Sequence, residues 1–202
     1  MGRCARSATR DGALSRGFSL SELVVTLAVL MVLAAIAVPS LSRVFAIYQL
    51  NDSAARLAGV LKFTRYEAIR LDKPISGRVL ASGTDWMVFA DTNGNGVADP
   101  TETIDLITGT VTLLPAGGMP DTSPITSSLG NSLLVLTSIS AMNATLTFDA
   151  RGAVLSGSGG NVYVLYLGNP ANTAIGYRAV VVLPSGVVQV WSSSSGTWQQ
   201  VS

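Results

Sequence analysis

Residues 23–38 form an unbroken apolar run, LVVTLAVLMVLAAIAV, in which Thr26 carries the only hydroxyl group. Sixteen helical residues are about 24 Å long, which is short for a hydrocarbon core of about 30 Å. Counted from Phe18, the segment reaches about 31 Å as a helix, which is long enough to cross that core. The run therefore predicts one membrane-spanning helix over residues 18–40.

The charge of the chain is uneven on the two sides of this run. Residues 1–17 hold four arginines and one aspartate, a net charge of +3, whereas the rest of the chain has nine basic and eleven acidic residues. Basic residues beside a membrane span favour the cytoplasmic side. We expect a basic leader in the cytoplasm and an exported remainder with a net charge of −2.

Glu22 stands at the front of the apolar run, although a carboxylate at the centre of a bilayer costs about 2.5–3.5 kcal/mol on insertion scales. A secretory signal cleaved after Ala37 and an uncleaved anchor both leave this residue unexplained, though tolerable near the interface. Cleavage between Gly17 and Phe18 explains it. The new α-amine of Phe18 then lies one helical turn from Glu22, so the two charges can pair within one chain or between neighbouring subunits.

The stretch RGFSLSELVVTLAVLMVLAAIAVP resembles the N-terminus of type IV prepilins, through Gly17, Phe18, Glu22 and Pro39. The resemblance implies cleavage after Gly17 and N-methylation of Phe18 by a prepilin peptidase. It implies anchoring in the bacterial inner membrane by one span, with a periplasmic head. It also implies assembly, through an inner-membrane platform and with other pilins or pseudopilins, into a pilus or pseudopilus.

After Pro39 the pattern predicts one amphipathic helix followed by strands. Apolar residues recur every three or four positions over residues 41–73, and the residue before Pro74 disfavours a helix. From residue 74 to 202 the period is two, which indicates a β-rich head. The expected strands are Ser76–Leu80, Trp86–Ala90, Thr103–Leu106, Val111–Leu114, Leu133–Thr137, Ala144–Phe148, Val162–Leu167, Tyr177–Leu183 and Val187–Trp191.

These elements predict an α+β fold in which a long N-terminal helix packs on an antiparallel β-sheet head. Two segments lack periodicity: we expect a long loop over residues 117–131 and a flexible loop at the serine run 192–195.

The head also resembles the GspH/FimT family of minor pseudopilins, through AARLAGVLKFTRYEAIRLDKPI, WMVFADTNGNG, TFDARGAV and YRAVVVLPSGVVQV. The resemblance implies a structural subunit of a type II secretion pseudopilus or a type IV pilus. Relatives that take part in DNA uptake tend to carry arginines near the last strand, and SGVVQVWSSSSGTWQQVS has none. Nucleic acid is therefore not an expected partner.

The composition gives no support for catalysis. The chain has no histidine, and its one cysteine, Cys4, lies in the predicted leader. No histidine base, no disulfide within the chain and no Cys/His metal site can form. We expect a protein that is not an enzyme and requires no cofactor.

One motif points to a metal. DTNGNGVADPTE matches the calcium-loop pattern D-x-[DN]-x-[DN]-G-x5-E. Calcium would be bound by the side chains of Asp91, Asn93, Asn95, Asp99 and Glu102 and by the backbone carbonyl of Val97. The alternative is a polar hairpin loop, because two Asn-Gly dipeptides are strong turn formers by themselves.

Three functions stay open at this point. The first is a structural pilin-like subunit, the second a DNA receptor for natural transformation, and the third a secreted calcium-binding β-domain released after Ala37. The mature N-terminus separates the first from the third, and salt-sensitive DNA binding identifies the second.

Overall fold

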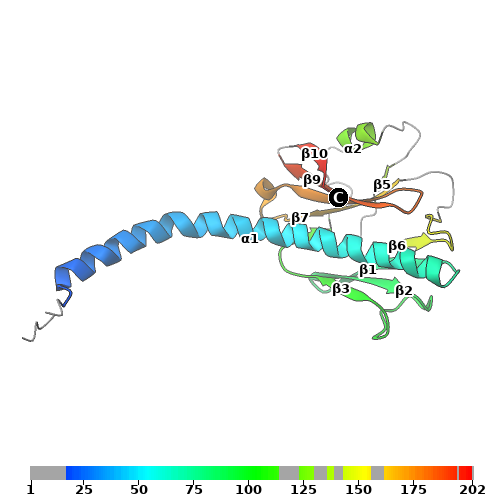
Figure 1. Ribbon diagram of the computed structural model, residues 1–202, viewed down its shortest axis with the longest axis horizontal. Coiled ribbons are helices and arrows are strands. Elements are labelled where there is room, and N and C mark those ends of the chain that lie inside the picture. Colours follow the sequence, from blue (N-terminus) through cyan, green and yellow to red (C-terminus); the bar gives the residue numbers. More distant parts are fainter. Residues whose placement is uncertain are drawn as a thin grey trace, which may run out of the picture. The chain divides into compact units, whose positions relative to one another are not determined.

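The computed structural model describes residues 17–113, 123–129, 136–138, 143–155, 162–194 and 196–201. The chain divides into two compact units, Met1–Ser42 and Arg43–Ser202, and each is described by itself. Helix α1, Leu20–Arg70, begins in the first unit, continues through Pro39 without a break and ends in the second (Figure 1).

Helix α1 has a cap at each end. The backbone N–H of Glu22 donates to Ser19 Oγ at 3.2 Å, in the Ser-x-x-Glu arrangement of a capping box. At the other end the N–H of Lys73 donates to the carbonyl of Ala68 at 3.2 Å, while Asp72 takes a φ of +50°. These are features of a Schellman cap, and Pro74 follows it.

The first sheet has four antiparallel strands in the order β3-β2-β1-β6. Strand β1 is central: Ser76 lies opposite Asp91 on one side and opposite Thr147 on the other. The register places the end of β2, and the loop that follows it, beside the start of β1. The four strands are β1 (Ile75–Ser82), β2 (Asp85–Asp91), β3 (Ile104–Ile107) and β6 (Asn143–Phe148).

The second sheet has the order β10-β9-β8-β7-β4, and β5 pairs with β7 as well. All its pairs are antiparallel except β5 with β7, which is parallel. Two short helices accompany it: α2 (Ser123–Ser128) and a 3-10 turn at Thr173–Ile175. Its strands are β4 (Thr112–Leu113), β5 (Leu136–Ser138), β7 (Val162–Gly168), β8 (Tyr177–Val182), β9 (Val188–Ser194) and β10 (Thr197–Gln200).

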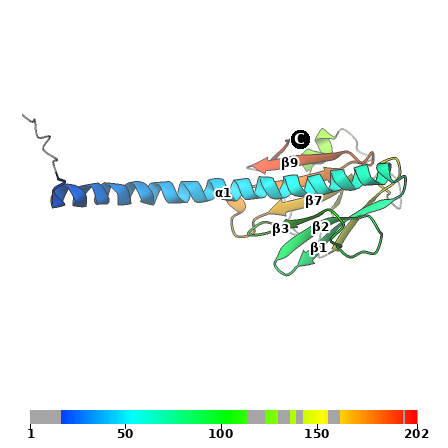
Figure 2. The same cartoon turned by 60° about the horizontal axis from the view of Figure 1, so that its bottom comes forward.

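The second half of α1 lies across both sheets (Figures 1 and 2) and shares one core with them. Its buried side chains come from one face of the helix, and most of the remaining cluster comes from the four strands of the first sheet and from β4, β7, β8 and β9 of the second. The principal members from α1 are Leu50, Ala54, Leu57, Ala58, Leu61 and Ala68.

Strands β7 and β8 are buried on both faces. In β7, Leu165 and Leu167 face the core under α1, whereas Val164 and Tyr166 belong to a second cluster that includes Ile125 of α2. Side chains alternate along a strand, so a sheet covered on both faces needs apolar residues at every position. This explains the continuous apolar runs YVLYL and AVVV. Trp191 and Trp198 also lie in the second cluster.

The fold class is confirmed: a long N-terminal helix is followed by mostly antiparallel strands. Three expectations need correction. The head has two sheets and one parallel strand pair, β5 with β7, because β6, which lies between them in the sequence, belongs to the first sheet. The expected loop 117–131 contains α2, although residues 117–122, 130 and 131 lie outside the described part.

The third correction concerns the serine run 192–195. Strand β9 continues to Ser194, and β10, which the alternation did not predict, pairs with it. Gly196 permits the turn with a φ of +82°, and Trp198 packs its ring 5.8 Å from that of Tyr166. The aromatic contact holds β10 to the sheet, which outweighs the loop-forming composition of the run.

Candidate functional site

The predicted processing segment lies at the start of the described chain. Gly17 and Phe18 are exposed, and Gly17 has no atom within 4 Å of the position that a Cβ would take. Helix α1 begins two residues after Phe18, and Glu22 lies in its first turn. The Gly17–Phe18 bond therefore lies in an exposed segment without helix or strand, immediately before a capped helix.

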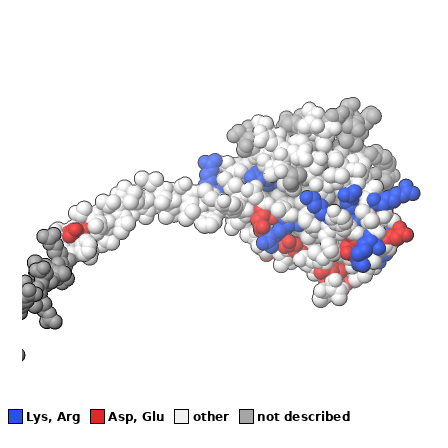
Figure 3. Space-filling model, in the orientation of Figure 1, with Lys and Arg blue, Asp and Glu red and all other residues white. Residues whose placement is uncertain are grey.

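The first half of α1 has no buried side chain: all residues from 17 to 45 are exposed. Among the helices that the structure describes, α1 alone is long and apolar enough to cross a membrane. On the face shown in Figure 3, charged groups are scattered over part of the head and are nearly absent along the first half of α1. An apolar surface of this extent indicates contact with lipid or with other apolar helices.

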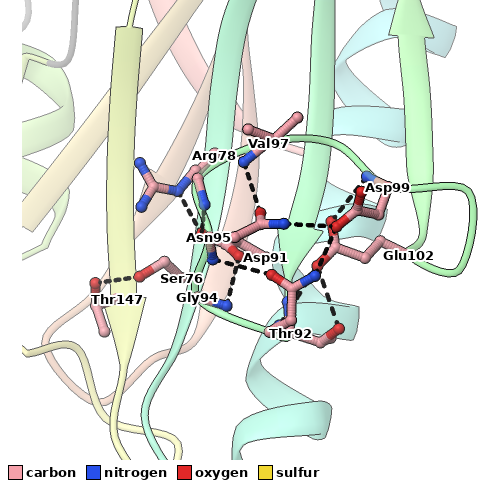
Figure 4. Close-up of polar contacts among 12 residues, drawn as sticks. Ser76, Arg78, Asp91, Thr92, Gly94, Asn95, Val97, Asp99, Glu102 and Thr147 are labelled. Atoms are coloured by element: carbon pink, nitrogen blue, oxygen red, sulfur yellow. Dashed lines mark hydrogen bonds and ion pairs between the residues drawn. The ribbon is translucent and has the colours of Figure 1, made fainter.

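The predicted calcium loop follows β2, and its first residue is buried. The Asp91 carboxylate is fully enclosed and accepts three hydrogen bonds (Figure 4). Arg78 Nε and the N–H of Gly96 donate to Oδ2 at 2.6 and 3.1 Å, and the N–H of Gly94 donates to Oδ1 at 2.7 Å. Gly94 and Gly96 reach these positions with φ of +77° and +79°, which glycine adopts without strain.

The middle of the loop is closed by its asparagines. The side-chain amides of Asn93 and Asn95 both donate to Asp99 Oδ2, at 2.6 and 2.7 Å. Their own Oδ1 atoms accept the N–H groups of Asn95 and Val97 at 2.9 and 2.8 Å. Each asparagine thus forms a local turn and donates a hydrogen bond to the carboxylate of Asp99.

Glu102 closes the end of the loop. Its Oε1 accepts the N–H of Thr92 at 2.8 Å, and its Oε2 accepts the N–H of Asp99 at 3.2 Å. At least one side-chain oxygen of each of the five predicted ligands therefore accepts a hydrogen bond from within the protein. Within the described ranges no three acidic, cysteine or histidine side chains gather closely enough to hold a metal ion. Calcium binding by this loop stays a prediction.

Three arginines of the described head, Arg56, Arg70 and Arg78, form ion pairs with carboxylates. Arg56 contacts Asp52 and Asp105 at 2.7 and 3.2 Å, and the hydrogen bonds that these carboxylates accept raise the pKa of Arg56. Arg70 donates to Glu67 at 2.6 Å, which lowers the pKa of that carboxyl. The surface therefore mixes positive and negative groups, as Figure 3 shows.

A family model described as type II transport protein GspH matches residues 53–186, more than half of the chain. The chain belongs to the GspH family. A second model, described as the prokaryotic N-terminal methylation motif, matches residues 13–38. That range contains Gly17, Phe18 and Glu22, so the predicted resemblance to prepilins is confirmed for this GspH-family chain.

Solved structures give a further comparison. The chain is similar to the type IV minor pilin FimU of Pseudomonas aeruginosa in two crystal forms. The first has 17% identity and a TM-score of 0.47, over 74% of this chain and 97% of FimU. The second has 16% identity and a TM-score of 0.48, over 75% of this chain and 93% of FimU. No curated protein sequence matches the chain.

The GspH-family chain thus combines two separate candidate regions. Gly17, Phe18 and Glu22 lie together at the start of α1, whereas residues 91–102 lie in the head. The capping role of Ser19 was not predicted, although the Ser-x-x-Glu spacing could have indicated it. The pairing of Arg78 with Asp91 was also missed, since it depends on the register of β1 and β2.

Proposed function

We propose that this GspH-family chain is a minor pilin-like subunit that is made as a precursor and assembled through α1 into a pseudopilus or pilus. A prepilin peptidase removes residues 1–17 and methylates Phe18. The span at residues 18–40 then holds the subunit in the inner membrane with its head in the periplasm. An inner-membrane platform transfers it into a fibre with other pilins or pseudopilins.

This proposal rests on the difference in burial between the two halves of α1. Its first half is apolar and exposed, whereas its second half is built into the core of the head. Such a helix needs a lipid or helical environment for one half and presents a folded head on the other. Cleavage after Ala37 would discard most of that apolar surface, so the secreted-domain alternative leaves the first half of α1 without a use.

Pairing between the Phe18 amine and the Glu22 carboxylate explains why a charged residue is kept in the span. In an apolar environment a lone charge is costly, and a partner from a neighbouring subunit removes that cost in one register only. The helix cap does not need this carboxylate, because Ser19 accepts from the backbone of Glu22.

The proposed role is structural. The chain contains no histidine, and the carboxylates of the loop at residues 91–102 are engaged in local hydrogen bonds. These observations support a head that acts through its surface.

The test is the mass of the mature protein purified from membranes. We expect a chain that begins at Phe18 and carries one additional methyl group. Gly17→Glu should retain the leader, because a charged side chain would occupy the cleavage site, whereas the control Gly12→Glu should be processed normally. A mature chain that begins at Val38 would contradict the proposal.

A further inference from the structure

A groove of about 410 Å³ runs along α1 on the side of the last strands. Its α1 wall consists of Asn51, Ala54, Ala55, Ala58, Gly59 and Lys62, whose spacing of three and four residues places them on one face of the helix. Arg178 of β8, Val190 of β9 and Val201 complete the lining. The whole groove lies within the unit Arg43–Ser202.

Arg178 is the unusual residue of this groove. It is 8% exposed, and its recorded hydrogen bonds go to neutral acceptors: Nε donates to Asn51 Oδ1 at 2.7 Å and Nη1 to the carbonyl of Tyr177 at 2.8 Å. Among the described residues, no acceptor bonds to its Nη2. Burial lowers the pKa of Arg178 below its ordinary value, yet a guanidinium stays charged in proteins.

The arginines of the head that form ion pairs differ from Arg178. Within the described residues, Arg56, Arg70 and Arg78 each form an ion pair with a carboxylate, and Arg178 forms none. The groove lining adds a second cation, Lys62, and includes no acidic residue. A largely buried positive charge without a counter-charge favours the binding of a carboxylate.

The floor of the groove permits a close approach. Three alanines and one glycine line it, and a Cβ on Gly59 would meet no atom within 4 Å. Small side chains on a helix allow the backbone of another segment to come near. The groove therefore has room for a chain segment. Because Arg178 and Lys62 line it, a segment with a negative charge should bind best.

We propose that this groove binds a segment of a neighbouring fibre subunit that carries a carboxylate among small apolar residues. The carboxylate meets Arg178, and the small residues lie on the alanines of α1. Lys62 adds a second positive charge to the same lining. The inference rests on the proposed role as a fibre subunit and adds the chemistry by which a neighbour is recognised.

The arrangement favours a carboxylate over a nucleic acid. Duplex DNA is held by several exposed cations that follow its phosphates. Arg178 lies inside the groove, and Arg65 beyond it donates to the carbonyls of Gly152 and Ser185 at 2.9 and 3.3 Å. A single planar carboxylate matches the fork of one guanidinium.

The test uses the full-length mature protein in neutral detergent micelles and two blocked peptides, acetyl-Ala-Ala-Glu-Ala-Ala-amide and its glutamine analogue. Binding is followed by NMR through the Nε–Hε signal of Arg178 and the amide signal of Gly59. We expect the glutamate peptide to shift both signals saturably and to bind at least about tenfold more tightly than the glutamine peptide.

Variants locate the contact. Arg178→Gln should weaken binding of the glutamate peptide at least about tenfold. Because that change also removes the bond to Asn51, the exposed residue Ala55 provides a second test: Ala55→Glu should occupy the groove with its own carboxylate and block the peptide. Arg56→Gln, at the next residue and outside the groove lining, is the control and should retain binding.

Three results would overturn the inference. They are equal binding of both peptides, binding that survives both Arg178→Gln and Ala55→Glu, and no saturable shift up to the solubility limit of the glutamate peptide. Displacement of the glutamate peptide by a short DNA duplex with a steep salt dependence would instead assign the groove to nucleic acid. The proposed role as a fibre subunit is tested separately, by determining the mature N-terminus of the protein in the same preparation.

Discussion

Arg78 Nε lies 2.6 Å from Asp91 Oδ2, and this ion pair joins the middle of β1 to the end of β2. The carboxylate is fully buried, whereas the arginine side chain is 26% exposed. Two backbone N–H groups of the following loop donate to the same carboxylate. One side chain therefore fixes both the strand pair and the start of the loop.

Removal of the Asp91 carboxylate should destabilise the head. Asp91→Ala leaves Arg78 without its partner and the N–H groups of Gly94 and Gly96 without acceptors, which should cost about 3 kcal/mol of unfolding free energy. Denaturant unfolding of the full-length protein in micelles, followed by tryptophan fluorescence, measures this. The control is Asp85→Ala, because Asp85 has no recorded side-chain bond within the described residues; equal losses in both variants would contradict the assignment.

Gly186 lies against Gly152, where two turns of the head meet. A Cβ on Gly186 would overlap the carbonyl oxygen of Gly152, and its φ of +78° is unfavourable for other residues. Gly186→Ala should therefore cost about 3 kcal/mol or more, from backbone strain and from the displacement of that turn.

Gly83 provides the matched comparison for this prediction. Its φ is +66°, but no atom lies within 4 Å of its Cβ position. Gly83→Ala should cost only the backbone strain, about 1–2 kcal/mol. The two variants are compared by the same denaturant titration, and equal costs would show that the contact with Gly152 is unimportant.

Glu22→Val should leave processing intact and reduce incorporation into fibres. The helix becomes more apolar, and Ser19 still accepts from the backbone N–H of residue 22, so insertion and the helix start are retained. Glu22→Gln, which keeps the size and removes the charge, should behave in the same way. Co-assembly with partner pilins is measured by fractionation of sheared fibres, and normal incorporation of both variants would refute the role of the carboxylate.

Duplex DNA should bind the full-length protein weakly at physiological salt. Non-specific binders reach dissociation constants of about 10⁻⁴–10⁻⁶ M by neutralising phosphates. Arg56 and Arg70 are already paired with carboxylates, and Arg65 donates to two backbone carbonyls. Fluorescence anisotropy with a labelled duplex tests this. Micromolar binding that is lost on changing Lys62, Arg56, Arg65 and Arg70 to glutamine would establish a DNA-binding face.

The head should fold without calcium. The loop at residues 91–102 closes through its own hydrogen bonds, and the Arg78 guanidinium supplies a positive charge beside Asp91. We expect the same melting temperature with a chelator as with millimolar calcium or magnesium.

If the loop binds calcium, the expected gain in the free energy of unfolding can be estimated. A saturated site stabilises a protein by about 2.7 kcal/mol at a hundred times its dissociation constant. A rise in melting temperature with calcium but not with magnesium, lost in Glu102→Gln, would therefore show that the loop rearranges around the ion. Glu67→Gln serves as the control, because Glu67 pairs with Arg70 outside the loop.

The long N-terminal helix and the resemblance to prepilins could be predicted from the sequence. The apolar run and the order of Gly17, Phe18 and Glu22 are local features, and α1 is held by bonds between residues close in sequence. The leader at residues 1–16 lies outside the described residues, and its removal stays a prediction. The strands were also predicted within a few residues for β1, β2, β3 and β6, because alternation of apolar residues is local as well.

What only the tertiary structure decided depends on contacts between distant residues. Three features depend on which apolar faces pack together. They are the division into two sheets, the parallel pairing of β5 with β7, and the packing of Trp198, in β10, against Tyr166. The same holds for the partners of Asp91 and for the absence of a carboxylate beside Arg178 among the described residues. Spacing along the chain fixes the periodicity of an element, but burial and ion pairing depend on the packing of the completed fold, where the removal of water makes each unpaired charge costly.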